Sequence, residues 1–289
     1  MRFATAARFV PLGLKRPLGA LAGALLVAAF LLAAFADVVA PQDPIAQDIP
    51  NRLAPPGSES LFGTDNFGRD VLSRVIHGFR AALAVGVASV LVGTAVGVVI
   101  GGASAYLGGW VDLTTQRAVD AFLGFPFLVL AVVIVAALGA SAPTVVFAIS
   151  VALAPHVVRL TRASALSVTG RPHVMAARAI GAGTPRILLK HILPHSLGPV
   201  LAYATGFVGT ALVAESSLSF LGLGVPPPSP SWGGMLQEGR QFLEMAPWLV
   251  IFPAVALSTT ALSFVFVGDL LRDVLDPRVA PRRSRHGSP

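Results

Sequence analysis

The chain has 289 residues, of which 54% are hydrophobic and only 12% are charged, and its mean hydropathy is +0.76. This composition lies well outside the range of soluble proteins and predicts an integral membrane protein. The net charge of +7 does not indicate nucleic-acid binding, because the basic residues gather in particular segments, and the absence of cysteine excludes disulfides and thiol chemistry.

Six apolar stretches are long enough to cross a bilayer, which takes about 20 largely apolar residues. None of them alternates with a period of two, so the sequence predicts an all-α membrane protein with six transmembrane helices rather than a barrel. The predicted spans are residues 18–40, 81–106, 118–139, 142–158, 198–221 and 247–268.

The basic residues lie unevenly on the two sides of this predicted bundle. With the N-terminus in the cytosol, 16 of the 21 Lys and Arg residues fall in inner segments. This asymmetry follows the positive-inside rule, and six spans then place both termini in the cytoplasm. The basic excess on the inner side also suits contact with anionic membrane lipid.

Residues 1–40 are predicted to form a cytosolic N-terminus and the first span. The sequence AFA at 34–36 resembles a signal-peptide cleavage site. The apolar run before it is longer than a signal-peptide core, which favours an uncleaved first span.

Residues 41–80 form a predicted extracytoplasmic segment that contains GTDNFGRD at 63–70. Its acidic residues could indicate a metal loop, but their spacing is not that of a calcium loop. We therefore expect a structural turn with internal pairing of Arg69 and Asp residues.

The second span carries glycines at positions 93, 97 and 101, which lie along one side of a helix. Such a stripe permits close approach of another helix. The approaching helix could belong to the same subunit or to a second one, and the sequence does not decide between them. Pro126 in the third span and Pro155 in the fourth are expected to kink their helices.

A polar, basic insert at 159–199 interrupts the hydrophobic spans and is predicted to hold two short helices. Pro172 suits the first turn of one helix, and the glycines at 181 and 183 can end it. Thr184 suits the N-cap of the second helix, which Pro194 is expected to close. In the first helix Val174, Ala177 and Gly181 form a narrow stripe that could enter a groove of a partner protein.

No cluster of residues in the sequence indicates catalysis. The chain has no phosphate-binding G-x-x-x-x-G-K-S/T loop and no zinc-ligand spacing, so it is not predicted to be an enzyme or to bind a cofactor or metal. Glu215 is an acid within the fifth span, where a charge must face protein or water. It is either a residue of the translocation path or a paired residue near the outer mouth.

The insert also carries a family resemblance. MAARAIGAGTPRILLKHILP at 175–194 resembles the "EAA" loop of ABC importer permeases, with Met175 at the glutamate position. The segments 61–80, 216–243 and 268–278 resemble the peptide and nickel branch of these permeases, in the subunit usually encoded second. Together the resemblance covers roughly residues 20–278 and implies the type I ABC importer permease fold, with a core at 81–276. The basic composition of residues 277–289 predicts a disordered tail.

The resemblance further implies a function and a set of partners. The chain would be a multi-pass protein of the bacterial inner membrane that forms half of a pore. A homologous second permease, two cytosolic ATPase subunits that bind ATP and Mg²⁺, and an extracytoplasmic binding protein would complete the importer. The residues expected to contact the ATPase are Met175, Ala176, Ala177, Arg178, Gly181, Leu193 and Pro194.

The substrate stays open among dipeptides, longer peptides, nickel chelates and glutathione. A stand-alone ion-coupled secondary transporter is the alternative class. Such carriers usually show several intramembrane acids or matched half-repeats, whereas this sequence has essentially one deep acid.

Overall fold

The structure is a computed structural model that describes residues 17–275. The predicted residues 1–16 of the N-terminal segment and the tail at 277–289 lie outside that range. The described helices are α2 (Pro17–Ala34), α3 (Ala36–Val39), η1 (Ile49–Asn51), α4 (Val71–Leu107), α5 (Gly109–Leu123), α6 (Phe127–Leu138), α7 (Ala142–Thr169), α8 (Pro172–Ala179), α9 (Thr184–Ile187), the π-helical turn η2 (Leu188–Ile192), α10 (Leu193–Phe220), α11 (Trp232–Gly239), η3 (Arg240–Phe242) and α12 (Trp248–Leu275).

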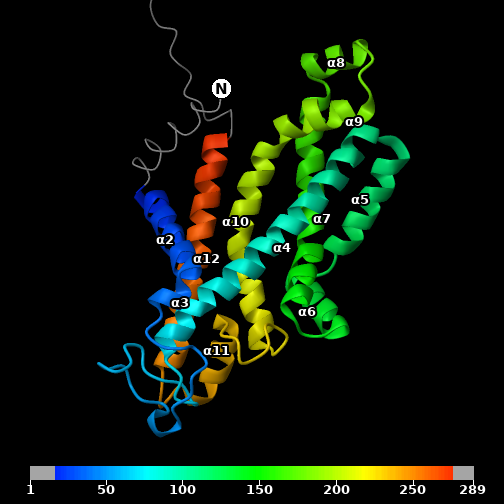
Figure 1. The fold of residues 1–289 in the computed structure, drawn as a ribbon. Coiled ribbons are helices and arrows are strands. Elements are labelled where there is room, and N and C mark those ends of the chain that lie inside the picture. The colour runs from blue at the N-terminus through cyan, green and yellow to red at the C-terminus, as the bar shows by residue number, and fades with distance from the viewer. Residues whose placement is uncertain (1–16, 276–289) are drawn as a thin grey trace, which may run out of the picture.

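The long helices run between the two ends of the molecule, and α4 crosses the bundle obliquely (Figure 1). Five helices of residues 17–275 are long and apolar enough to cross a membrane, and the count is six if the bent pair α5–α6 forms one span. The predicted all-α membrane bundle is confirmed, and its six spans agree with the larger count. Helix α2 begins and α12 ends toward the end of the bundle that carries α8, while α3 and α11 lie at the opposite end (Figure 1).

Two helices extend well beyond the predicted spans because they continue through polar residues. Helix α4 begins at Val71 rather than at residue 81, since the Asp70 side chain accepts a hydrogen bond from the Ser73 amide and caps the helix. Helix α7 runs to Thr169, eleven residues beyond the predicted span, so the first part of the predicted insert is helical. The hydropathy pattern predicts that both spans stop at charged residues, but the helices continue because these charged side chains pair with residues of other elements.

The third predicted span is not one straight helix. Helices α5 and α6 meet at an angle of 87° across residues 124–126, and Pro126 stands at the N-cap of α6. The kink expected at this proline is confirmed, although the helical pair begins at Gly109, nine residues before the predicted span.

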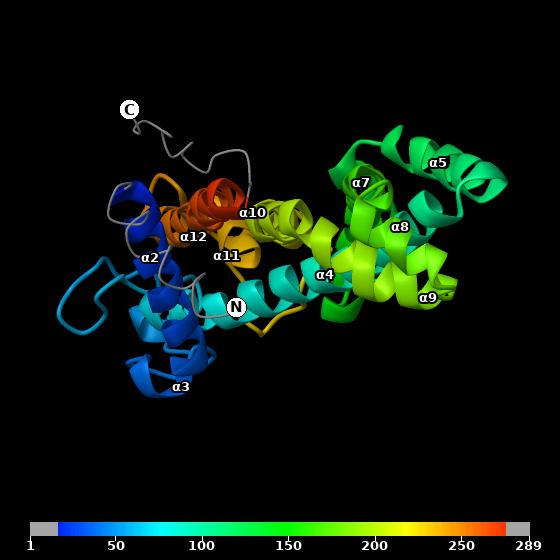
Figure 2. The ribbon, with the colours of Figure 1, turned by 90° about the horizontal axis from the view of Figure 1, so that it is seen from above.

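The glycine stripe of α4 packs against α7 within the same chain. A Cβ atom at position 97 would lie 2.5 Å from the Val157 Cβ, and one at position 101 would lie 2.4 Å from the Val158 carbonyl oxygen. Of the two alternatives left open by the sequence, packing inside one subunit is therefore correct for this stripe. Helix α4 runs obliquely beneath the other helices and joins the α2–α10–α12 group to the α5–α7 group (Figure 2).

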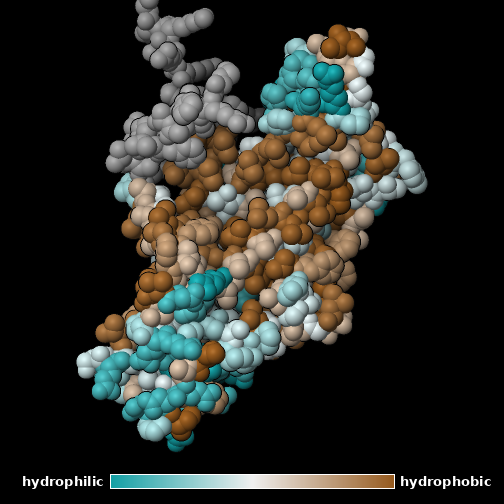
Figure 3. Space-filling view, viewed as in Figure 1, coloured by the Kyte–Doolittle hydropathy of each residue, from teal (hydrophilic) through white to brown (hydrophobic). Residues whose placement is uncertain are grey.

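The surface divides into an apolar band between two polar ends (Figure 3). One polar end consists of residues 40–70 with α11, and the other surrounds α8 and α9. Following the orientation that the sequence predicts, we call the first the outer end and the loop of the second (residues 170–192) the cytoplasmic loop.

Candidate functional site

The cytoplasmic loop contains the helix that the sequence predicted. Pro172 lies in the first turn of α8, and the chain turns back at Gly181 with a φ of +78°. The Gly181 amide donates to the Arg178 carbonyl at 3.0 Å, and the Ala182 amide donates to the Ala177 carbonyl at 3.0 Å. This is a Schellman C-cap, and its left-handed residue favours glycine. Gly181 is therefore required by the turn that ends α8.

The second predicted helix differs from the prediction at both ends. Gly183, not Thr184, is the N-cap of α9, and no side chain caps the helix. Pro194 does not close the helix, because α9 passes through the π-helical turn η2 directly into α10. A proline ring clashes with the carbonyl four residues earlier, and the wider π-helical turn just before Pro194 relieves that clash.

One face of α8 packs on its own chain rather than on a partner. Val174 is fully buried and Ala177 is 4% exposed, in a small apolar cluster with Ala105, Ala165, Val168, Ile187 and Ile192. The predicted docking stripe of Val174, Ala177 and Gly181 is therefore wrong for its first two members. The buried Leu193 likewise belongs to the base of the loop. These residues hold α8 in place.

The opposite face of α8 is exposed and mainly apolar. Met175 is 60% exposed and Ile180 is 85% exposed, and Ala176 and Gly181 lie on the same surface. The Arg178 guanidinium is 5.2 Å from the centre of the Tyr106 ring at the end of α4. Pro194 is exposed at the start of α10. Of the predicted coupling residues, Met175, Ala176, Arg178, Gly181 and Pro194 are thus accessible to a partner.

Helix α5 braces the part of α7 that carries the loop. Arg162 of α7 donates two hydrogen bonds to the Asp112 carboxylate of α5, at 2.6 and 2.5 Å. Arg159 also pairs with Asp120. Paired guanidinium and carboxylate groups in this geometry are directional, so α5 and α7 form one bracket beneath the loop.

Glu215 is fully buried in α10 near the outer end of the bundle. Its carboxylate accepts hydrogen bonds from the hydroxyls of Ser219 at 2.8 Å and Ser216 at 3.3 Å. The acid is thus satisfied by its own helix, and the surface of the chain does not expose it. Its predicted place in the translocation path stays a prediction.

A separate cavity of about 330 Å³ opens between α10 and α12 on the side of the cytoplasmic loop. Tyr203, Phe207 and Thr210 line it from α10, and Asp269 and Arg272 line it from α12. Within residues 17–275 neither of these two charged side chains forms a salt bridge. The cavity combines apolar, hydroxyl and charged groups at the surface of a membrane bundle.

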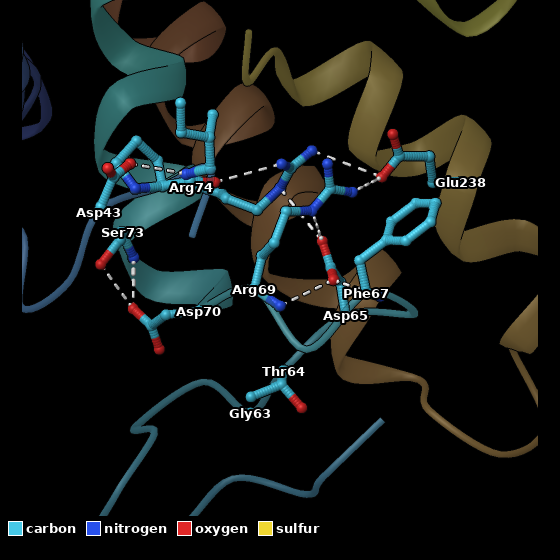
Figure 4. Close-up of polar contacts among 12 residues, drawn as sticks. Asp43, Gly63, Thr64, Asp65, Phe67, Arg69, Asp70, Ser73, Arg74 and Glu238 are labelled. Atoms are coloured by element: carbon cyan, nitrogen blue, oxygen red, sulfur yellow. Dashed lines mark hydrogen bonds and ion pairs between the residues drawn. The ribbon is translucent and has the colours of Figure 1, made fainter. Parts of the chain in front are cut away.

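At the outer end, four charged side chains form a largely buried network (Figure 4). Arg69 contacts Asp65 at 2.6 Å and Glu238 at 2.8 Å, and Arg74 contacts the same two acids at 3.5 and 3.4 Å. The predicted internal pairing of Arg69 with Asp65 is confirmed. The network joins the loop before α4 to α11, which is 164 residues or more away in sequence.

The sequence did not identify Glu238 as the partner of two arginines. A signal was present, because Arg74 lies in the first turn of a long apolar helix and needs an acid nearby. The sequence could not say which acid, since α11 reaches the network only through the tertiary fold. In the part of the chain that the structure describes, no group of His, Asp or Glu is arranged to hold a metal ion.

Comparison with known proteins decides the family. The profile of the family described as binding-protein-dependent transport system inner membrane component matches residues 93–281. The chain belongs to this family of ABC transport permeases. The permease is 39% identical over 267 residues to a dipeptide transport system permease protein of Alkalihalophilus pseudofirmus, covering 92% of this chain and 88% of that protein.

Other relatives agree with this assignment. The permease is 39% identical over 250 residues to a glutathione transport system permease protein of Escherichia coli O1:K1, covering 86% of this chain and 82% of that one. Its fold resembles a chain of the MetNI methionine ABC transporter in an inward-facing conformation, with a TM-score of 0.55 and 22% identity, over 70% of this chain and 96% of the other. The type I importer fold and a multi-pass inner-membrane location follow.

Proposed function

We propose that this permease forms half of the pore of an ATP-driven, binding-protein-dependent importer of peptides or related small solutes. The two relatives named for dipeptide and glutathione transport support this substrate class. The family match favours this function over a stand-alone ion-coupled carrier. A second permease, two ATPase subunits and an extracytoplasmic binding protein would complete the transporter, and ATP and Mg²⁺ would bind to the ATPases.

The observation that carries the proposal is the exposed apolar face of α8. Met175 and Ile180 are held outward by a helix whose other face is buried in the permease. Soluble surfaces rarely present such side chains together unless they bind another protein. The enrichment of basic residues around the loop supports a cytoplasmic position for it, with both termini on the same side. The face of α8 would therefore be the ATPase contact, with Met175 in place of the family glutamate making that contact more apolar.

Force on α8 would pass to the bundle through two routes. The braced α5–α7 bracket leads to α4, and the continuous α9–η2–α10 helix leads to the cavity beside α12. Movement of α8 by the ATPases would then shift α10 against α12 and switch the pore between inward- and outward-facing states. The Tyr203, Thr210, Asp269 and Arg272 side chains would line the inner part of that pore.

Crosslinking tests the proposal directly, because the sequence has no cysteine to interfere. In the assembled transporter, Met175→Cys or Ala176→Cys labelled with a photoactivatable maleimide should crosslink to an ATPase subunit. Leu61→Cys at the outer end, where the side chain is 62% exposed, is the matched control and should give no such product. Crosslinks from α8 that reach no nucleotide-hydrolysing protein would overturn the assignment.

A further inference from the structure

A second cavity, of about 430 Å³, lies at the outer end of the permease. Its size is within the ~300–1,000 Å³ range of small-molecule sites. Three segments far apart in the sequence form its wall: the loop before α4, the proline-rich turn after α10, and α11 with the turn that follows it. The lining residues are Gln47, Asn66, Phe67, Arg69, Pro227, Pro228, Gln237, Glu238, Gln241 and Phe242.

Four of these lining residues are carboxamides, from Asn66, Gln47, Gln237 and Gln241. Among residues 17–275, none of the four side chains forms a hydrogen bond, and the Asn66 side-chain oxygen is buried without a partner. Each carboxamide offers both a donor and an acceptor. Gln47 and Gln241 are exposed and Gln237 is half-buried, so their unpaired carboxamides are accessible to a ligand that supplies N–H and C=O groups together.

The charged floor of the cavity has no net charge. Arg69 and Glu238 line it, and with Arg74 and Asp65 they form a network of two cations and two anions (Figure 4). Arg69 also lies 4.7 Å from the centre of the Phe67 ring and fixes that ring beside the cavity. The charges therefore hold the wall in place, and they do not select a charged ligand.

We propose that this carboxamide-lined cavity binds the main chain of an extended peptide as the solute enters the permease. The peptide backbone carries alternating N–H and C=O groups and is neutral along its length, which matches the carboxamides and the neutral floor. The rings of Phe67, Phe242 and the two prolines form apolar walls that accept varied side chains. The cavity would thus recognise peptides through features that all of them share. This inference rests on the proposed function.

The test compares uptake of two peptides by two forms of the transporter. The peptides are trialanine and trialanine methylated at one peptide nitrogen, which lacks one main-chain donor. The permease forms are wild type and the double variant Gln237→Met/Gln241→Met, each assembled with its partners in liposomes. Uptake is measured with saturating peptide-loaded binding protein, after its affinity for each peptide has been determined.

Wild type should transport the methylated peptide about three- to ten-fold more slowly, as expected for one lost hydrogen bond. The double variant should transport trialanine more slowly by a similar factor and should show no further loss with the methylated peptide, since coupled groups are not additive. Gln42→Met, a carboxamide of the same outer segment that does not line the cavity, is the matched control and should behave as wild type.

Three results would overturn the proposal in different ways. An equal penalty for the methylated peptide in wild type and double variant would show that the cavity does not bind the main chain. Weaker binding of the peptide-free binding protein to the double variant would make the cavity a docking surface for that protein. Absence of ATP-driven peptide uptake by wild type would instead reject the proposed function, and this site with it.

Discussion

The outer end and the cytoplasmic loop are held by opposite kinds of interaction. At the outer end, Arg69, Arg74 and Asp65 are buried and pair with the half-buried Glu238, and these ion pairs tie the first loop to α11. The cytoplasmic loop rests on a small apolar cluster, a Schellman turn and one arginine over a tyrosine ring. Ion pairs in fixed geometry specify one arrangement, whereas the cytoplasmic loop has no buried ion pair among its described contacts. The outer end is therefore a scaffold, and the cytoplasmic loop, moving together with α8, is the part suited to move.

The largest effect is expected from removing the shared acid of the outer network. Glu238→Leu leaves two buried guanidinium groups with Asp65 as their one acidic partner among the described residues. Breaking a buried pair in this way costs about 3–5 kcal/mol, because the remaining charge is desolvated without compensation. Denaturant unfolding in detergent should show this loss. Glu244→Leu, which changes an exposed acid of the same end, should leave stability near wild type. Equal midpoints for the two variants would contradict the scaffold assignment.

A smaller loss is expected where α4 connects the two ends. In Gly97→Ala the new Cβ would lie 2.5 Å from the Val157 Cβ, so α4 and α7 must separate. Overpacking of this kind costs about 1–3 kcal/mol. Gly23→Ala makes the same change in α2, where nothing lies within 4 Å of the added carbon. Thermal unfolding of the two variants should therefore differ, and similar midpoints would show that the α4–α7 contact is looser than the structure indicates.

The cytoplasmic loop should show the reverse pattern, with a small stability loss and a large functional loss. Gly181→Asp places a side chain at a φ of +78° with no atom near it, so unfolding should be affected by only about 1 kcal/mol. The distorted C-cap would misplace the exposed face of α8, and ATP-driven uptake should be abolished while the protein remains in the membrane.

Gly183→Asp is the matched control for that prediction. It adds the same charge two residues away, at a φ of −67° and at the N-cap of α9, where aspartate is favoured. Uptake should therefore persist in this variant. Loss of uptake in both variants would point to charge repulsion at the ATPase contact rather than to the geometry of the turn, and normal uptake in Gly181→Asp would remove α8 from the coupling role.

The sequence predicted the bundle because its signals are local. Apolar length predicted the six spans, Pro172 and Gly181 predicted α8, and the glycine spacing predicted close packing along α4. The boundaries at residues 71 and 169 were missed for a tertiary reason. Charged residues such as Arg74 and Arg162 remain helical because acids of other elements neutralise them. A hydropathy profile does not show which distant residue in the sequence will pair with a charged side chain.

The sequence was also unable to reveal the tertiary contacts of the candidate sites. The residues proposed for coupling were recognised as a motif, but the sequence could not show that Ala177 faces inward while Met175 and Ile180 face outward. An eight-residue helix with apolar side chains on both sides gives no clear periodicity. The outer cavity was not predicted either, since its lining residues come from three segments that only the fold brings together.

The smallest loss of stability is expected from removing the exposed ion pair of Asp37 and Arg80 at the outer end. Comparing this pair with the buried network shows how much burial contributes. Asp37 lies just beyond the end of α2, with Arg80 at 2.9 Å and His77 at 3.2 Å. Hydrogen bonds from Arg80 and then from His77 lower the pKa of the Asp37 carboxyl below its ordinary value. An acid whose pKa is lower in the folded state stabilises the fold at a pH above its unfolded pKa, and this contribution is lost as the pH falls through the folded pKa.

The melting temperature of Asp37→Asn should thus lie only slightly below that of wild type near neutral pH. The difference should disappear in about 1 M salt, where screening reaches ~3 Å, and again at a pH below the folded pKa of Asp37. The deficit of Glu238→Leu should persist in the same salt, because buried charges are screened much less. If salt removed both deficits alike, burial would not distinguish the scaffold from an ordinary surface pair.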